Sequence, residues 1–383
     1  MTSPNGPRPA SPDSSPQRAT TLELFFDIVF VFTVTQLTGV LARDMSLLAA
    51  GRVLLIFALL WWMYGGYAWL TNARAPTRAA ERLLLLGGMA GFLVAGLAIP
   101  GAFGSSGTRG PDGVAFGCGY LIVVLVHSGL YLRANRHIWR IIPFNVTSAL
   151  LVIVAGLVTA PAAYAIWAAA FVVQVVAPVF VRLGGRFDIQ PAHFAERHGG
   201  LMIVAFGESV VDVGIGASGQ RATMSLGLSA ALGLALVAAL WWAFFGTGED
   251  ELAEKVMTGA DASRRPGLAL AVYFYPYIPM LLGIVATAAG LKHALARPGA
   301  PMPAGPALAL AGGVALFLAG DLMFRRVLRL GSARYRAAGA VAALACWPVP
   351  VAVTADTGIA LLTAIVVAVL AVERLSGRDT VNG

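Results

Sequence analysis

Residues 22–41, LELFFDIVFVFTVTQLTGVL, form an apolar segment that is long enough to cross a bilayer, yet it contains Glu23, Asp27 and Gln36. A carboxylate at membrane depth costs about 2.5–3.5 kcal/mol on insertion scales, so it normally faces a protein interior, a water-filled cavity or a cationic partner. The segment is therefore predicted to be a helix that lines an internal site. On this helix Glu23 and Asp27 share one stripe, while Gln36 points in nearly the opposite direction.

Each of the two carboxylates has a structural and a functional interpretation. The spelling Thr20-Thr21-Leu22-Glu23 is that of a capping box, in which Glu23 stabilises the start of the helix. Asp27 either forms a buried ion pair with an arginine of another helix or binds an ion or a proton. The sequence leaves both alternatives open for Asp27.

A second apolar segment, residues 199–217, carries Glu208, Ser209 and Asp212. Two carboxylates one helical turn apart repel each other, so one of them is expected to bind a proton, a cation or an arginine. We predict that Glu208, Ser209 and Asp212, like Asp27 and Gln36, contribute to an ion-, proton- or substrate-binding site.

Glu196, Arg197 and His198 directly precede this second segment. They are predicted to lie at the membrane interface and to form ion pairs rather than to bind substrate. Arg197 is expected to pair with Glu196, Asp27 or Glu23.

Three other features have weaker functional interpretations. His127, late in the segment 114–132, is either a proton relay with Asp27 or a packed hydrogen-bonding residue. Pro276 and Pro279 should break or kink the helix that contains them. Transporters use such breaks near substrates, but a simple structural kink is the favoured interpretation. Asp321 precedes Arg325 by four residues and is expected to pair with it on one helix.

Composition fixes the class of protein. The 383 residues are 58% hydrophobic and 12% charged, with a mean hydropathy of +0.77, which excludes a water-soluble domain of this size. The formal net charge is +8, but the basic residues lie in short clusters between apolar segments, so they indicate membrane topology and not nucleic acid binding. We therefore expect an all-α, multi-pass bundle whose principal partner is the lipid bilayer.

A window of about 20 residues per span predicts twelve transmembrane helices. They cover residues 22–41, 47–70, 82–100, 114–132, 141–159, 161–181, 199–217, 223–246, 268–290, 304–324, 337–354 and 357–373. Alternate connections and the two tails hold 21 of the 27 Lys and Arg residues. Because positively charged loops stay in the cytoplasm, this asymmetry predicts that both termini are cytoplasmic.

The two halves of the chain share a weak internal repeat. Leu60-Trp61-Trp62 has its counterpart in Leu240-Trp241-Trp242, each in the second helix of its half. We predict two parallel six-helix repeats, residues 21–190 and 191–375, with any central path between them. A disordered cytoplasmic tail, residues 1–20, precedes them, and a short cytoplasmic tail, residues 376–383, follows.

Two motifs carry a resemblance to a known family. The segment from Glu23 to Leu37, ELFFDIVFVFTVTQL, resembles the opening signature of the bacterial low temperature requirement A (LtrA) family. The segment ERHG from Glu196, which continues to Gly207-Glu208-Ser209, is similar to the mid-chain motif of that family. Asp212 and Asp321 depart from the family pattern. The resemblance implies an integral membrane protein linked by name to growth in the cold, and it implies no biochemical activity.

Several classes of function lack their motifs here. The sequence contains no phosphate loop, no HExxH, no GxSxG in a strand–turn–helix context and no Cys/His metal set, so we expect neither an enzyme nor a bound cofactor or metal. Cys118 and Cys346 both lie in apolar segments and are expected to be packing residues.

Three functions remain compatible with the sequence. The first is a secondary transporter of the bacterial cytoplasmic membrane, which acts as a monomer or as a homo-oligomer. Its buried carboxylates would couple the movement of a small solute to the movement of protons or monovalent cations. The second is a cation channel of six-plus-six helices, to whose Phe-Ser-Asp motif Phe25-Phe26-Asp27 is loosely similar. The third is a lipid-responsive structural protein or a membrane-embedded enzyme.

Overall fold

The computed structural model describes residues 18–104, 111–134, 136–180, 189–246, 248–330 and 333–379, so the predicted tails lie largely outside the described residues. Within these ranges the chain is helical and contains no strand. The first set of helices comprises α1 (Thr21–Arg43), α2 (Leu47–Ala73), α3 (Ala79–Ala98), α4 (Pro111–Ala134), α5 (Ile142–Leu157) and α6 (Ala162–Phe180), with short helices η1 (Ile99–Gly101) and η2 (Arg136–Arg140).

The second set of helices begins after the gap that follows α6. It comprises α7 (Pro191–Ala217), α8 (Met224–Phe245), α9 (Glu249–Gly259), α10 (Arg265–Ala269), η3 (Leu270–Phe274), α11 (Tyr277–Ala296), α12 (Ala304–Leu328), α13 (Ala333–Ala345), α14 (Val349–Ala352) and α15 (Ala355–Asp379). Helix α9 lies in the connection between α8 and α10, where the sequence analysis expects no helix.

Ten helices of the described chain are long and apolar enough to cross a membrane, which confirms the multi-pass helical class. Each of the twelve predicted segments contains a helix, but two of them fall short of this criterion. The described apolar part of α6 is shorter, at Ala162–Val176, and the segment 337–354 is divided into α13 and α14 around Pro348. Proline has no backbone N–H to continue a helix, which accounts for this second interruption.

The predicted break at Pro276 is confirmed. The span Arg265–Ala296 runs through α10, the π-helical turn η3 and α11, and the amide of Tyr275 bonds to the carbonyl of Leu270 five residues earlier. The indole Nε1 of Trp61 in α2 donates to the carbonyl of Phe274, at 3.2 Å. The interruption therefore presents a backbone acceptor to the first set of helices.

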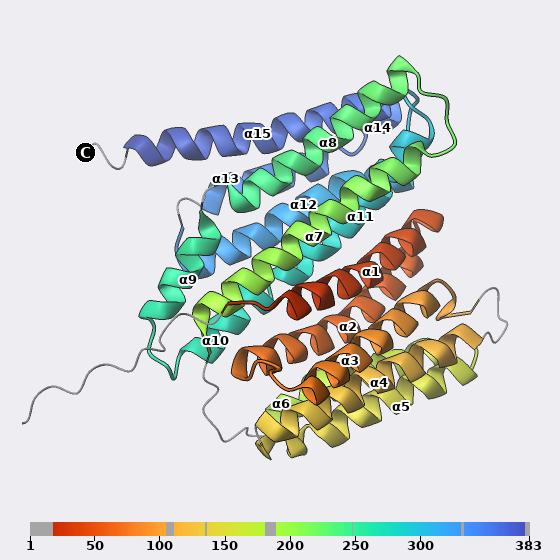
Figure 1. Cartoon of the computed structure of the whole chain (residues 1–383). Coiled ribbons are helices and arrows are strands. Elements are labelled where there is room, and N and C mark those ends of the chain that lie inside the picture. The colour runs from red at the N-terminus through yellow and green to blue at the C-terminus, as the bar shows by residue number, and fades with distance from the viewer. Residues whose placement is uncertain are drawn as a thin grey trace, which may run out of the picture.

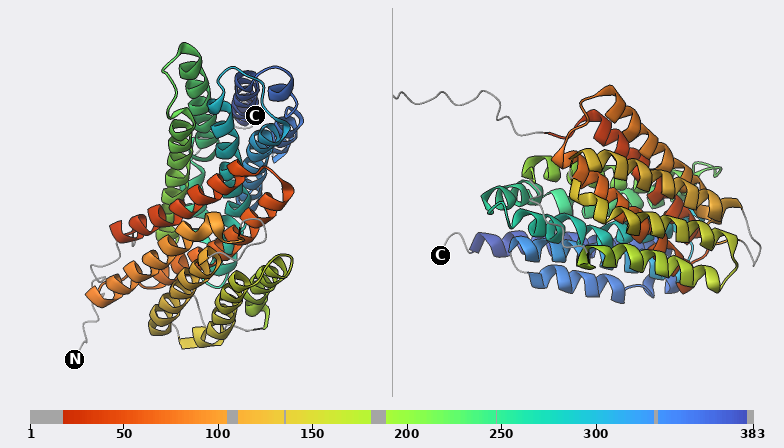
Figure 2. Two further views of the ribbon diagram at one scale, coloured as in Figure 1. Left: turned by 90° about the vertical axis from the view of Figure 1, so that its right-hand side faces the viewer. Right: turned by 90° about the horizontal axis from the view of Figure 1, so that it is seen from below.

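The two sets of helices pack internally with the same pairing. In the first set α1 contacts α2 and α3, α3 contacts α4, α4 contacts α5, α5 contacts α6, and α2 contacts α4 and α6. In the second set α7 contacts α8 and α11, α11 contacts α12, α12 contacts α13, α13 contacts α15, and α8 contacts α12 and α15. Figures 1 and 2 show the red-to-yellow helices on one side of the molecule and the green-to-blue helices on the other.

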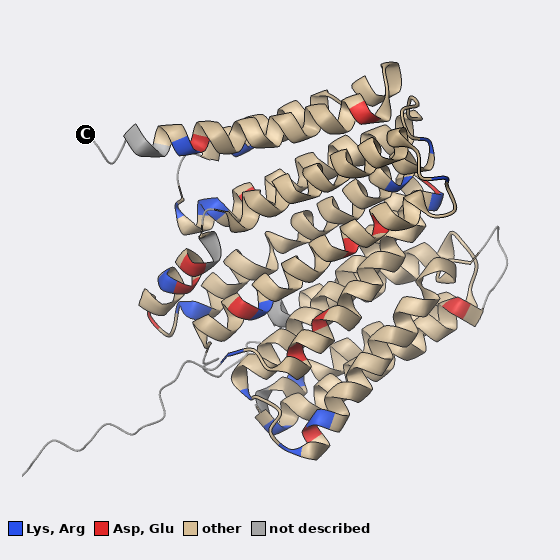
Figure 3. Cartoon of the chain, turned by 45° about the horizontal axis from the view of Figure 1, so that its top comes forward, with Lys and Arg blue, Asp and Glu red and all other residues tan. Residues whose placement is uncertain are grey.

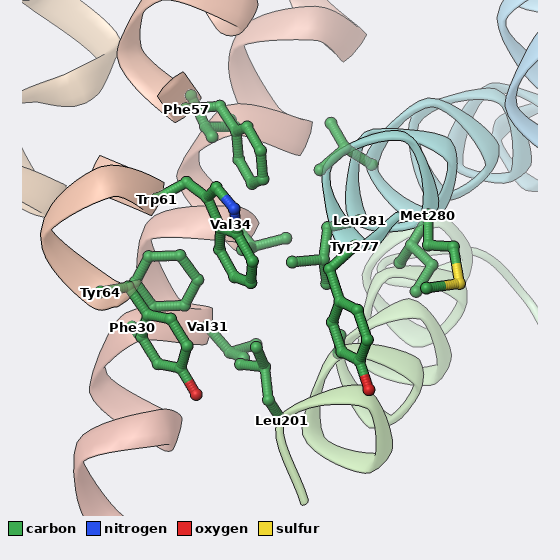
Figure 4. Packing of buried hydrophobic residues seen from close by; sticks show 14 of the residues in the cluster. Phe30, Val31, Val34, Phe57, Trp61, Tyr64, Leu201, Tyr277, Met280 and Leu281 are labelled. Carbon is green, nitrogen blue, oxygen red and sulfur yellow. The ribbon is translucent and has the colours of Figure 1, made fainter. Parts of the chain in front are cut away.

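The two sets meet along α1 and α2 on one side and α7 and α11 on the other. Figure 4 shows the apolar part of this interface, in which Phe30 and Trp61 face Tyr277 and Leu281 of α11, with Leu201 of α7 beside them. All five side chains are at most 1% exposed. Burial of this apolar surface holds the two sets together over the middle of the bundle.

Charged residues concentrate at the end of the bundle where α1 begins, which is called the α1 end below. Figure 3 shows Lys and Arg gathered there, at the starts of α3, α7, α10 and α13 and at the ends of α12 and α15. The far end, where α1 terminates, carries fewer described basic residues, namely Arg43, Arg52, Arg221, Lys292 and Arg297.

Close packing between α11 and α12 provides the first prediction. A Cβ atom at Gly313 would lie 2.5 Å from the backbone nitrogen of Thr287, whereas a Cβ atom at the neighbouring Gly312 meets no atom within 4 Å. Gly313→Val should therefore lower the free energy of unfolding by about 1–3 kcal/mol through overpacking. The thermal unfolding midpoint of the purified protein in detergent measures this loss. Gly312→Val is the matched control, and equal midpoints for the two variants would contradict the packing described here.

Candidate functional site

A network of buried charged residues joins the two sets of helices near the α1 end. Its centre is Arg197 of α7, whose guanidinium lies 3.5 Å from Glu23 and 3.4 Å from Asp27, both on α1. All three residues are at most 1% exposed. Of the three partners that the sequence proposes for Arg197, the structure selects Glu23 and Asp27. Glu196 is exposed, and its carboxylate accepts a hydrogen bond from the amide of Ala19.

Glu23 is fixed by the start of its own helix. Thr20 caps α1, its hydroxyl accepts from the amide of Glu23, and the Glu23 carboxylate accepts from the Thr20 amide at 2.7 Å. The predicted capping box is therefore confirmed. One carboxylate oxygen remains for the network, so Glu23 serves the helix end and the ion pair together.

Helix α2 supplies neutral hydrogen-bonding groups to the network. The hydroxyl of Tyr64 donates to Asp27 Oδ1 at 2.9 Å, and the Arg197 guanidinium donates to the hydroxyl of Thr71. The guanidinium also lies over the rings of Phe26 and Tyr64, at 5.4 and 5.5 Å from their centroids. Residues of two helices, α1 and α2, therefore hold Arg197 of α7 in one position.

His193 belongs to the network, although the sequence analysis does not include it. Its Nε2 lies 2.9 Å from Glu23 Oε1, and its Nδ1 lies 3.2 Å from the amide nitrogen of Asn72. The amide of Gln190 donates to the side-chain oxygen of Asn72, which fixes Asn72 Nδ2 as the donor to His193. His193 Nδ1 is then an acceptor, and the imidazole is neutral with its proton on Nε2, directed at Glu23.

The spacing of His193 and Arg197 is a sequence signal for the place of His193. His193 precedes Arg197 by four residues, so the two lie on the same face of a helix. The predicted span begins at residue 199, whereas α7 begins at Pro191. The helix therefore begins eight residues before the predicted span, and its first two turns carry His193 and Arg197.

The charges of this network do not balance. Two carboxylates, Glu23 and Asp27, face one guanidinium, and the neutral imidazole of His193 adds no charge. Asp27 Oδ2 is buried and has no hydrogen-bond partner among the described residues. A net negative charge out of water is costly unless it binds a proton or a cation, and Asp27 Oδ2 is the buried acceptor of this network that has no partner among the described residues.

The other acidic residues of α7 lie nearer the far end. Glu208 is half-buried and Asp212 is buried, and each has one carboxylate oxygen without a hydrogen-bond partner in the described chain. Ser209 is buried and its hydroxyl bonds only weakly to its own helix, at 3.5 Å from the carbonyl of Ala205. Asp212 experiences repulsion from Glu208 and attraction from Lys292 of α11. By the helical rise these residues lie about 16–22 Å from Arg197 along α7.

The remaining predicted residues lie outside both groups. Gln36 is half-buried on α1. His198 is buried: its Nδ1 bonds to the carbonyl of Phe194, and its ring packs against Phe194, Tyr273 and Tyr277. His127 is buried against Tyr67 and Tyr131, and its relay role with Asp27 stays a prediction.

A second group of buried charges lies wholly within the second set of helices. Arg336 of α13 contacts Asp321 of α12 at 3.0 Å and Glu373 of α15 at 2.9 Å, and Arg325 lies 3.8 Å from Glu373. Asp321 therefore has a close ion pair with Arg336, a partner that its spacing does not predict, and it is also attracted by Arg325, the partner that its spacing does predict. Two acidic and two basic side chains balance here, which is typical of a structural ion-pair cluster.

A cavity of about 680 Å³ lies between the two sets of helices. It is bounded by α2, α4, α5 and α6 of the first set and by the α10–η3–α11 span of the second. Its lining comprises Leu54, Ala58, Trp61, Trp62, Gly65, Gly66, Trp69, His127, Tyr131, Ile138, Ile141, Asn145, Phe171, Val175, Pro266, Leu270, Phe274, Tyr275 and Ile278. No group of three or more potential metal ligands occurs within the described ranges of the chain.

Comparison with known proteins agrees with the motifs of the sequence. Residues 18–372 match the model of the family described as bacterial low temperature requirement A protein (LtrA). The chain is also 31% identical over 322 residues to an uncharacterized protein of Rhizobium meliloti (strain 1021), in an alignment that covers 80% of this chain and 76% of that protein.

The network predicts that removal of Arg197 lowers the stability of the protein strongly and that a second substitution restores part of it. Arg197→Met leaves Glu23 and Asp27 buried without their cation, which should lower the free energy of unfolding by about 3–5 kcal/mol. Adding Asp27→Asn to this variant removes one buried charge and should restore part of the loss. The unfolding midpoint in detergent measures both effects. Arg326→Met, at an exposed arginine of the same end, should stay near wild type, and a wild-type midpoint for Arg197→Met would exclude the ion-pair arrangement.

Proposed function

The chain belongs to the bacterial low temperature requirement A family, and we propose that it is a secondary transporter of the bacterial cytoplasmic membrane. It moves a small solute together with protons or monovalent cations. The observation that carries this proposal is the charge imbalance of the network around Arg197, at the contact between the two sets of helices. The proposal includes no catalytic activity, cofactor or nucleic acid, and the protein acts in the bilayer alone or as a homo-oligomer.

Proton or cation binding at Asp27 is the first step of the proposed mechanism. The network has a net charge of about −1 when both carboxylates are ionised, because one guanidinium compensates only one of them and the neutral imidazole contributes no charge. A proton or a monovalent cation at Asp27 Oδ2 neutralises this charge, and that atom has no competing partner among the described residues. Tyr64 donates to Oδ1 and leaves Oδ2 for the incoming ion.

Release of the contact between the two sets of helices is the second step. Arg197 belongs to α7, while Glu23 and Asp27 belong to α1, so their ion pairs cross the interface. A protonated Asp27 is neutral and attracts Arg197 less, which leaves Glu23 as the charged partner across the interface. The α1 end then opens while the apolar contacts in the middle of the bundle act as the pivot, which is the rigid-body motion of alternating access.

The two-repeat layout is part of this proposal. Support comes from the shared helix pairing, in which α1, α2, α3 and α4 correspond to α7, α8, α11 and α12. In this layout α6 and the α13–α14 pair supply the two spans beyond the ten apolar helices. Six is an even number, so both repeats start on the same side, and the basic residues at the α1 end favour that side as the cytoplasm.

Glu208, Ser209 and Asp212 form the proposed second station for the coupling ion. They lie toward the far end on the helix that carries Arg197, and Lys292 partly compensates their charge. Carboxylates at membrane depth with unfilled acceptor atoms are typical of ion pathways. Movement of α7 relative to α1 would therefore act on both stations at once.

Opening of the α1 end is testable without a known substrate. Spin labels at Thr77, between α2 and α3, and at Glu251 of α9 report the distance across this end by double electron–electron resonance, after Cys118 and Cys346 are replaced by alanine. The distance distribution should shift to longer values between pH 8 and pH 5, because acid protonates Asp27. Asp27→Asn should show the long distance at both pH values. A wild-type distribution that ignores pH, or an Asp27→Asn protein that follows it, would contradict the gating step.

Flux measurements separate the proposed transporter from its alternatives. Liposomes with purified protein and lumenal pH- and cation-sensitive dyes are exposed to gradients of neutral and cationic amphipathic solutes. The proposal predicts ion flux that requires a solute gradient and is lost in Asp27→Asn and Glu208→Gln, while Glu251→Gln, at an exposed residue of α9, keeps it. Electrogenic flux without solute would indicate a cation channel, and absence of flux under all conditions would favour a structural protein.

A further inference from the structure

The cavity between the two sets of helices has an aromatic and uncharged lining. Trp61, Trp62 and Trp69 of α2 contribute three indole rings, and Phe274 and Tyr275 of η3 and its C-cap face the cavity from the second set. None of the described residues that line it is Asp, Glu, Lys or Arg. A volume of about 680 Å³ is within the range of about 300–1,000 Å³ that is usual for pockets of drug-sized organic ligands.

One wall of this cavity carries an unused hydrogen-bond acceptor. Asn145 of α5 is 4% exposed, and its Oδ1 has no hydrogen-bond partner among the described residues. A buried amide oxygen without a donor costs about 1–3 kcal/mol, so a ligand that brings a donor gains this energy. His127 of α4 lies on the same wall, with its ring against the backbone at Gly66.

We propose that this cavity binds a neutral, amphipathic organic molecule that has an aromatic or aliphatic body and a hydroxyl or N–H group that donates to Asn145. The uncharged lining disfavours an ionic body, because no opposite charge would replace its hydration. The indole and phenol rings of the lining stack on an aromatic body. This inference rests on the proposed function, for which it names the class of solute.

A direct packing path connects this cavity with the ion network. Trp61 lines the cavity and stacks on Tyr64, with ring centroids 5.2 Å apart and planes at 14°. The hydroxyl of Tyr64 donates to Asp27. Displacement of the Trp61 ring by a ligand therefore acts on the hydrogen bond that prepares Asp27 for its ion, as coupled transport requires.

Binding can be measured with a fluorescent probe of this class. N-phenyl-1-naphthylamine is neutral and aromatic and has one N–H donor, and its excitation overlaps tryptophan emission. With the full chain in lipid nanodiscs, we expect saturable energy transfer from tryptophan to one probe molecule per chain, above the linear signal of empty nanodiscs. The N-methyl derivative lacks the donor and should bind about tenfold more weakly, which is the value of one hydrogen bond.

Three variants test the place and the hydrogen bond. Ala58→Phe in α2 and Val175→Phe in α6 fill part of the cavity and should each weaken binding of the probe at least tenfold, whereas Ala50→Phe, at an exposed site of the same helix as Ala58, should not. Asn145→Leu should bind the probe and its N-methyl derivative equally. Unchanged unfolding midpoints identify the variants that remain folded. Because Val175 is 39% exposed, Val175→Phe is expected to be among them.

The outcomes separate this inference from the proposed function. Saturable binding with the expected variant effects supports the ligand class even if the liposomes show no flux, and that combination would overturn the transport proposal alone. Absence of saturable binding, wild-type binding by both cavity-filling variants, or a preserved preference for the N–H probe in Asn145→Leu would overturn the ligand class, whatever the flux measurements give.

Discussion

The position of one guanidinium determines most of the arrangement at the α1 end. Arg197 is almost fully buried, and a buried cation is tolerable only where anions and hydrogen-bond acceptors surround it. Glu23 and Asp27 provide the charge from the other set of helices, and Thr71 provides a hydroxyl. These contacts therefore favour the register in which the two sets meet at this end. On the proposed function, protonation of Asp27 would weaken this contact, because it would remove one of the two charges that attract Arg197.

The elements that local sequence controls were predictable, and the contacts between distant segments were not. The apolar spans follow from residue hydropathy, the capping box of Glu23 from four consecutive residues, and the break before α11 from Pro276. The acidic residues were recognised as buried because their segments are otherwise apolar. The partner of Asp27 had several candidates, since nothing in one sequence states which helix ends meet. The pairing of Asp321 with Arg336 was missed for the same reason: it depends on how α12 packs against α13, whereas the spacing within α12 favours Arg325.

The two buried charge groups show how similar residue types can have different consequences. In the group of Asp321, Arg325, Arg336 and Glu373, two acids meet two bases within one set of helices, so the group is neutral and ties neighbouring helices of that set. Around Arg197 two acids meet one base across the interface of the two sets. Of these two groups, the one around Arg197 would lose net buried charge on binding a proton or a cation, and on the proposed function this binding acts on the contact between the two sets of helices.

The cavity and the network are adjacent because α2 takes part in both. Successive turns of this helix direct Trp61 and Trp69 to the cavity, and Tyr64 and Thr71 to the network. A rigid helix with two functional faces transmits a change on one face to the other without any flexible element between them. The break at η3 completes the arrangement, because the carbonyl of Phe274 accepts the indole N–H of Trp61. The interrupted helix of the second set thus holds Trp61, the residue that links the cavity to Tyr64, through this hydrogen bond. A ligand in the cavity that accepts from the indole N–H could replace the carbonyl of Phe274.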